Sequence, residues 1–199
     1  MRVGIYGGTF SPIHNGHVAA ALAFMEQMWL DLLFVVPTGQ SPHKQMSNGA
    51  TASDRLNMCR LAFEGHEGII VSDTEIKRNG KSYTVDTLRE FYREDDRLFM
   101  LCGTDMMLSL DSWYQPQEIF RLCYPVYIRR EDDEETKKRL IEKNAEYKKK
   151  YGKIVTRINA PAVVISSEEI RKKIKEGQSI HGLVPEKVEE YIYKQGLYL

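Results

Sequence analysis

The stretch that decides the fold reads Gly7-Gly8-Thr9-Phe10-Ser11-Pro12-Ile13-His14-Asn15-Gly16-His17. It follows a short apolar run at residues 3–6 with the pattern of a strand, and it leads into helical spacing at residues 16–29. In an open parallel sheet, ligands bind in the loop beyond the carboxyl end of a strand. Paired glycines let the backbone approach a ligand closely, and the N–H groups at a helix start favour phosphate. The stretch therefore predicts a strand, an anion-binding loop and a helix.

Two histidines stand three residues apart where this helix is expected to begin. At that spacing His14 and His17 can face the same side and reach one bound group. They could also form a buried hydrogen-bonded pair or hold a metal ion, although the stretch contains no cysteine or third histidine to complete a metal site. Contact with a phosphate is the favoured interpretation, and Thr9 offers a hydroxyl beside it.

Strands and helices continue to alternate outward from this stretch. Further strands are expected at residues 32–36, 69–71, 98–102, 126–128 and 154–158. Further helices are expected at residues 53–63, 85–92, 116–122 and 132–150. Such alternation indicates an α/β fold, a Rossmann-like open parallel sheet with helices on both faces.

Two more helices are expected after the last strand. Ser166 can cap the first, and Glu169 three residues later completes a capping box. Pro185 suits the first turn of the second helix, and Gly196 suits its C-terminal end. These helices predict a C-terminal helical part at about residues 161–199.

Length and composition indicate one domain whose core covers about residues 1–160 of the 199.

Lys plus Arg and Asp plus Glu each number 28, so the zero net charge predicts no nucleic acid polymer as partner. The three cysteines form no C-x-x-C pair, which favours a reducing compartment. The most apolar stretch, residues 17–36, contains Glu26 and Asp31, and the N-terminus lacks a signal-peptide pattern. We expect a cytoplasmic protein without a membrane span.

Two strings imitate nucleotide-binding motifs but lack a required glycine. Residues 80–82 read GKS like the end of a P-loop, yet that motif needs glycine where the chain has Glu75. Gly4, Gly7 and Gly8 likewise miss the G-x-G-x-x-G spacing of hydride-transferring dinucleotide domains. Neither class of protein is indicated.

Residues 8–17 resemble the first signature of the HxGH nucleotidyltransferases, which in one branch reads G-G-T-F-D-P-x-H-x-G-H. Residues 165–171, ISSEEIR, resemble their second signature, I-S-S-T-x-I-R. Between the two, further strings are similar to the nicotinate-nucleotide adenylyltransferases: PHK at residues 42–44, SYTVDTL at 82–88, GTD at 103–105 and WY at 113–114. The resemblance therefore covers nearly the whole chain.

This resemblance implies an enzyme that moves AMP from ATP to nicotinate mononucleotide in NAD biosynthesis. The products would be deamido-NAD and pyrophosphate, formed by in-line attack without a covalent intermediate, and Mg²⁺ would accompany ATP. Nicotinamide mononucleotide and phosphopantetheine are alternative acceptors for this fold. A nucleotide-binding sensor without turnover is a further alternative. The charged residues 132–150 are expected to be mainly a solvated face, although they or the C-terminal helices could form a homo-oligomer contact.

The resemblance also assigns roles to individual residues. The catalytic residues would be His17, His14, Lys44 and Arg171, with His17 stabilising charge on the α-phosphate. The residues that bind ATP would be Gly8, Thr9, Phe10, His14, His17, Gly103, Asp105, Ile165, Ser166 and Arg171. The residues that bind the pyridine nucleotide would be Thr84, Trp113, Tyr114 and Lys44.

Three positions need separate interpretation. Ser11 stands where the family commonly has Asp, and we expect a mild effect because Ser can also serve as a helix-entry acceptor. Glu168 stands where Thr is common, and an acid there would repel a triphosphate unless it turns toward solvent or a metal ion. Spacing alone makes Trp113 a core residue, whereas its place in the family pattern favours stacking on a pyridinium ring.

Overall fold

The computed structural model describes residues 1–40, 49–78, 80–128, 133–160 and 165–199. Within these residues, six parallel strands form one sheet in the order β3-β2-β1-β4-β5-β6. The strands are β1 (Arg2–Gly8), β2 (Leu32–Pro37), β3 (Ile69–Val71), β4 (Arg97–Gly103), β5 (Tyr124–Ile128) and β6 (Thr156–Ile158). All six expected strands are confirmed. The strand order reverses between β1 and β4, which is where ligands bind in open sheets of this kind.

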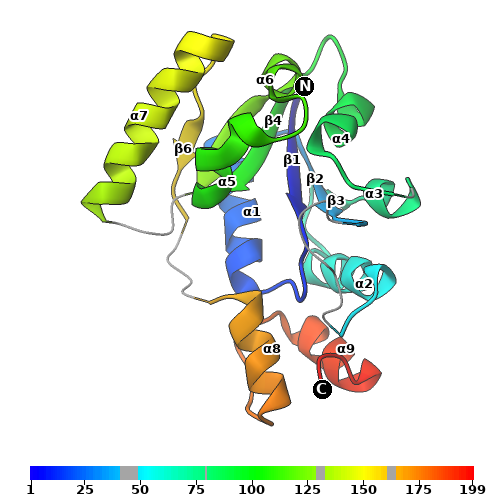
Figure 1. Cartoon of the computed structure of the whole chain (residues 1–199). Coiled ribbons are helices and arrows are strands. Elements are labelled where there is room, and N and C mark those ends of the chain that lie inside the picture. The colour runs from blue at the N-terminus through cyan, green and yellow to red at the C-terminus, as the bar shows by residue number, and fades with distance from the viewer. Residues whose placement is uncertain (41–48, 79, 129–132, 161–164) are drawn as a thin grey trace.

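The helices lie on both faces of this sheet, as the sequence predicts (Figure 1). They are α1 (Asn15–Gln27), α2 (Ala52–Ala62), α3 (Thr74–Lys77), α4 (Thr84–Phe91), α5 (Thr104–Ser109), α6 (Pro116–Leu122), α7 (Glu134–Tyr151), α8 (Ser167–Lys175) and α9 (Glu186–Gln195), with a 3₁₀ turn η1 (Leu110–Ser112). Helices α3 and α5 and the turn η1 were not predicted, because each is too short for a helical period to be recognised.

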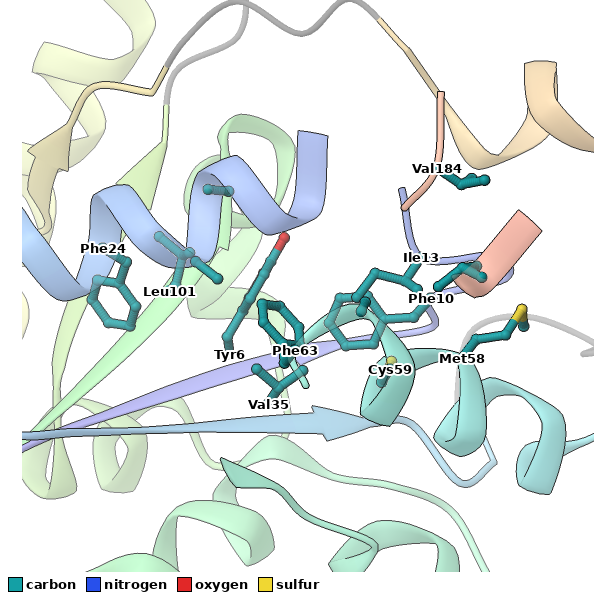
Figure 2. Packing of buried hydrophobic residues seen from close by; sticks show 14 of the residues in the cluster. Tyr6, Phe10, Ile13, Phe24, Val35, Met58, Cys59, Phe63, Leu101 and Val184 are labelled. Atoms are coloured by element: carbon teal, nitrogen blue, oxygen red, sulfur yellow. The ribbon is translucent and has the colours of Figure 1, made fainter. Parts of the chain in front are cut away.

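The two faces of the sheet carry separate hydrophobic clusters, and successive strand residues alternate between them. In β4, Phe99 and Leu101 belong to one cluster, whereas Met100 packs in the other. The first cluster includes residues of α1, α2, α8 and α9, and the second includes residues of α4, α5, α6 and α7. Figure 2 shows part of the first cluster, in which Tyr6 and Phe10 lie close to Phe63. The C-terminal helices thus share a core with the first helix of the chain.

The C-terminal helices begin and end close to their predicted positions. The Ser166 hydroxyl accepts a hydrogen bond from the Glu169 N–H at 3.1 Å, and the Glu169 carboxylate accepts from the Ser166 N–H at 2.9 Å. The expected capping box is therefore confirmed. Gly196 ends α9 with a φ of 61°, a left-handed conformation that glycine adopts readily, and Pro185 immediately precedes that helix.

The three cysteines lie in the two hydrophobic clusters. Cys59, Cys102 and Cys123 are buried free thiols, and burial raises the pKa of each, so they pack as small apolar groups. Of the helices in the described ranges, not one has the length and apolar character required to cross a bilayer.

Candidate active site

The β1–α1 loop, residues 9–14, turns sharply around a buried aromatic ring. Phe10 has a φ of 48°, in the left-handed region, and its side chain is only 2% exposed. The ring meets Tyr6 and His17 edge-on, with centroid distances of 5.3 and 5.1 Å. A Cβ atom at position 8 would lie 2.8 Å from the ring, so Gly8 leaves room for Phe10. The Phe10 ring therefore belongs to the core (Figure 2), and any contact of this residue with ATP must come from its backbone.

The two histidines lie at the start of α1. His14 occupies the N-cap position and is buried, while His17 is half-buried in the first turn. Their rings stack with a centroid distance of 3.7 Å and an interplanar angle of 29°. The His17 Nδ1 atom accepts a hydrogen bond from the His14 N–H at 3.3 Å. In a neutral imidazole that accepts at Nδ1, the proton lies on Nε2, which gives His17 a donor on the far side of its ring.

The second signature lies directly against the first. Arg171 of α8 donates a hydrogen bond from Nη1 to the Ser11 carbonyl at 2.7 Å. The Ser167 hydroxyl donates to the Pro12 carbonyl at 2.9 Å. The structure thus brings Arg171 to the loop that leads into the two histidines, although the bonded residues are 160 positions apart in the sequence.

Ser11 has a different partner from the one expected. His14, and not Ser11, is the N-cap of α1, so the prediction that Ser11 serves as the helix-entry acceptor is wrong. The Ser11 Oγ atom lies 3.2 Å from the Tyr198 phenol oxygen, and both side chains are buried. Burial raises the pKa of Tyr198 to about 12, so this hydrogen bond joins two neutral hydroxyls. The end of the chain therefore helps to hold the β1–α1 loop.

This contact predicts that Ser11 and Tyr198 act as a unit. We expect Ser11→Ala and Tyr198→Phe each to lower the free energy of unfolding by about 1 kcal/mol, because each leaves one buried hydroxyl without its partner. The double variant should lose clearly less than the sum of the two single losses. Urea unfolding of the four proteins measures this coupling. Strictly additive losses would show that the two hydroxyls do not interact in solution.

A cavity of about 400 Å³ opens beside the loop, which is a volume typical of small-ligand sites. Thr84 contributes from the first turn of α4, and Trp113 and Tyr114 contribute from the segment after η1. Trp113 is half-buried and also packs against the second hydrophobic cluster. The exposed Tyr114 ring lies 4.7 Å from that of Tyr83. The three residues expected to surround a pyridine ring therefore line one cavity, together with Gly8 and Thr9.

Gly103 and Asp105 lie at and just after the end of β4, the strand that pairs with β1. Gly103 is the last residue of β4, and a Cβ atom added there would meet nothing within 4 Å. Asp105 is exposed in the first turn of α5. Because β4 pairs with β1 in parallel, Gly103 and Gly8 end adjacent strands at the same edge of the sheet. They flank the crevice where the strand order reverses.

The remaining predicted site residues differ in what they offer a ligand. Ile165 is half-buried against the first hydrophobic cluster. The Ser166 hydroxyl is already bonded to the Glu169 N–H and carboxylate, so binding a triphosphate through it requires a rearrangement of the cap. Glu168 is exposed to solvent, the condition under which it is expected not to repel a triphosphate. Lys44, with the rest of the PHK string, lies outside the described residues.

Further polar residues line this cavity for which the sequence suggested no role. The buried carboxylate of Glu75 accepts a hydrogen bond from the Thr87 hydroxyl at 2.7 Å, and both residues line the cavity. The Ser82 hydroxyl accepts from the N–H groups of Gly39 at 3.1 Å and Gln40 at 3.3 Å. This contact ties the segment after β2 to the start of α4. The short helix α3 that carries Glu75 left no periodic signal in the sequence.

The amino-acid sequence of this chain resembles known proteins over nearly its whole length. The model of the cytidylyltransferase-like family matches residues 5–190. A probable nicotinate-nucleotide adenylyltransferase of Synechococcus sp. (strain JA-3-3Ab) is 39% identical over 203 residues, which cover all of this chain and 95% of the relative. A probable nicotinate-nucleotide adenylyltransferase of Desulfatibacillum aliphaticivorans is 37% identical, with 100% of both chains covered.

Solved structures share the fold. The Plasmodium falciparum nicotinic acid mononucleotide adenylyltransferase complexed with NaAD has a TM-score of 0.76 and 21% identity, and the match covers 99% of this chain and 97% of the other. The same protein complexed with APC has a TM-score of 0.74 and 22% identity, covering 99% and 96% of the two chains. The sequence relatives and the family model establish the identity: this chain belongs to the cytidylyltransferase-like family and, within it, to the nicotinate-nucleotide adenylyltransferases.

Proposed function

We propose that this protein transfers AMP from ATP to nicotinate mononucleotide, which yields deamido-NAD and pyrophosphate in NAD biosynthesis. The observation that carries the proposal is the meeting of both signatures at the β1–α1 loop, through the hydrogen bond from Arg171 to Ser11. This loop adjoins a cavity lined by Trp113 and Tyr114. One edge of the sheet thus offers groups for phosphates and rings for a pyridine. The buried free thiols fit a cytoplasmic enzyme.

The reaction needs positioning and charge stabilisation more than a strong base. A nucleotide 5′-phosphate is largely ionised near neutral pH because its second pKa is about 6, so it can attack the α-phosphate of ATP directly. The attack forms a bond from the acceptor phosphate oxygen to the α-phosphorus and breaks the bond to the pyrophosphate oxygen. His17 donates from Nε2 to the α-phosphate oxygens as negative charge builds there. His14 supports the His17 ring from its stacked position.

The cavity accounts for the choice of acceptor. A pyridinium ring over the Trp113 indole forms a favourable cation–π pair. The first turn of α4, which begins at Thr84, presents backbone N–H groups that favour a carboxylate over a carboxamide. A flexible phosphopantetheine arm has no planar ring to use Trp113 and Tyr114. Nicotinate mononucleotide therefore fits the cavity better than either alternative acceptor.

Mg²⁺ fits this site as a companion of ATP. Across the described ranges, no group of three or more His, Cys, Asp and Glu side chains is placed to hold a metal ion. Magnesium in nucleotide-binding sites is commonly held by one or two carboxylates together with substrate phosphates and water. The exposed Asp105, in the first turn of α5, is a carboxylate that would suit this role. When bound, Mg²⁺ would neutralise part of the charge on the phosphates.

Steady-state kinetics with different acceptors test the proposal. Pyrophosphate release is measured with ATP, Mg²⁺ and, in parallel, nicotinate mononucleotide, nicotinamide mononucleotide or phosphopantetheine. We expect kcat/KM for nicotinate mononucleotide to exceed the other two values by roughly tenfold or more. Equal efficiency with the nicotinamide nucleotide would overturn the acceptor assignment. Binding of both nucleotides without turnover would identify a sensor instead.

A further inference from the structure

Arg55 of α2 is a fully buried charge next to the β1–α1 loop. Its side chain is 1% exposed. Nη1 donates a hydrogen bond to the Thr9 carbonyl at 2.8 Å, and Nη2 donates to the Gly39 carbonyl at 3.4 Å. The Nε–H is also buried and meets no acceptor among the described residues. This guanidinium is thus held by backbone carbonyls from the loops after β1 and β2.

No carboxylate pairs with this charge in the part of the chain that the structure describes. Glu75 attracts Arg55 at longer range, but its Oε1 atom accepts from Thr87. The other two groups that act on Arg55 electrostatically are Cys59 and Tyr198, and both stay protonated because burial raises their pKa. Arginine remains charged at neutral pH, even though burial lowers the pKa of Arg55. A buried positive charge without an ion-pair partner is costly, and a bound anion nearby would offset that cost.

The hydrogen bond to Thr9 also sets the direction of the next peptide N–H. In a trans peptide the C=O and N–H groups point in opposite directions, so a Thr9 carbonyl held toward Arg55 turns the Phe10 N–H away from it. The left-handed φ of Phe10 is a conformation found where successive N–H groups form an anion-binding concavity. Thr9 itself lines the cavity, together with Gly7 and Gly8.

We propose that Arg55 is a positioning residue of the phosphate site: it fixes the Thr9–Phe10 peptide and adds a buried positive charge behind the β1–α1 loop, where the acceptor's phosphate meets the phosphates of ATP. The proposal rests on the function proposed above. It predicts that Arg55 contributes to affinity through the phosphate of the ligand, and not through the pyridine ring or the ribose. A merely structural arginine would affect every ligand of the cavity alike.

Binding measurements separate these possibilities without requiring turnover. Dissociation constants are measured by calorimetry for nicotinate mononucleotide and for nicotinate riboside, which lacks the phosphate. Arg55→Met should weaken the mononucleotide by roughly tenfold or more and leave the riboside unchanged. Arg60→Met is the matched control on the same helix, because Arg60 is half exposed and lies 3.7 Å from Asp73, and it should change neither constant.

Arg55→Lys keeps the charge but cannot donate hydrogen bonds in the same two directions. The dissociation constant of the riboside divided by that of the mononucleotide measures the contribution of the phosphate. In Arg55→Lys this ratio should lie between the wild-type ratio and that of Arg55→Met. If Arg55→Met does not fold, a lowered ratio in Arg55→Lys supports the proposal and a wild-type ratio overturns it. Equal losses for riboside and mononucleotide, or no loss for either, also overturn it. Tight binding without catalysis in the wild type would instead refute the proposed reaction and leave the role of Arg55 intact.

Discussion

Replacement of His17 by alanine is expected to lower kcat for dinucleotide formation by about 10²-fold or more, the usual effect of losing a donor to charge that develops in the transition state. The hydrogen bond from the His14 N–H to Nδ1 places the His17 proton on Nε2. Because this donor acts mainly when charge builds on the α-phosphate, the KM values for both substrates should change much less than kcat. Discontinuous assays that quantify pyrophosphate and the dinucleotide give kcat and the two KM values.

A histidine elsewhere in the fold provides the control for His17→Ala. His66 lies just before β3, at the opposite end of the strands from the β1–α1 loop. His66→Ala should therefore leave kcat within about twofold of the wild type once folding is verified by circular dichroism. Near wild-type turnover in His17→Ala would remove this imidazole from the mechanism.

Replacement of Trp113 by alanine is expected to raise the KM for nicotinate mononucleotide by roughly tenfold while the KM for ATP stays nearly constant. A cation–π pair contributes about 0.5–2 kcal/mol, and loss of the apolar contact with the ring adds to this. Trp113→Phe keeps an aromatic face and should lose less. Equal increases in both KM values would mean that Trp113 supports the structure and does not contact the pyridine ring.

Fluorescence offers a second measurement of the same contact, because the chain has only two tryptophans. Trp29, the other one, is 79% exposed and lies after α1. In a Trp29→Phe background, nicotinate mononucleotide should quench the remaining emission, since the proposed stacking brings the pyridine ring against Trp113. A titration without quenching, although the ligand binds by calorimetry, would contradict the stacked arrangement.

Much of the fold was predictable because parallel strands that are covered on both faces are continuously apolar, and such short apolar runs can be recognised in the sequence. The run at residues 98–102 is continuously apolar, and in β4 both faces are buried. Ser166 and Glu169 predict a helix start because a capping box needs those residue types at that spacing. The contact of Arg171 with the β1–α1 loop was predictable only from the resemblance, since no local rule relates residues so far apart in sequence.

The parts that escaped prediction depend on long-range packing. Phe10 stands in a signature that suggests ligand contact, yet its ring fills the core, because Gly8 leaves space for it. Ser11 reads as a helix-entry residue, but its hydroxyl meets Tyr198 from the far end of the chain. Arg55 looks like an ordinary charge on an amphipathic helix, and only the fold shows that it is buried against the Thr9 carbonyl.

The central claim is that the β1–α1 loop holds ATP and the pyridine nucleotide head to head, so that AMP passes directly from one to the other. Single-turnover transfer from ATP labelled at the α-phosphorus tests this most directly. In the presence of Mg²⁺ and nicotinate mononucleotide, the label should appear in deamido-NAD in a one-to-one ratio with released pyrophosphate, and none should remain bound to denatured protein. Label attached to the protein, or pyrophosphate released without the dinucleotide, would contradict the account.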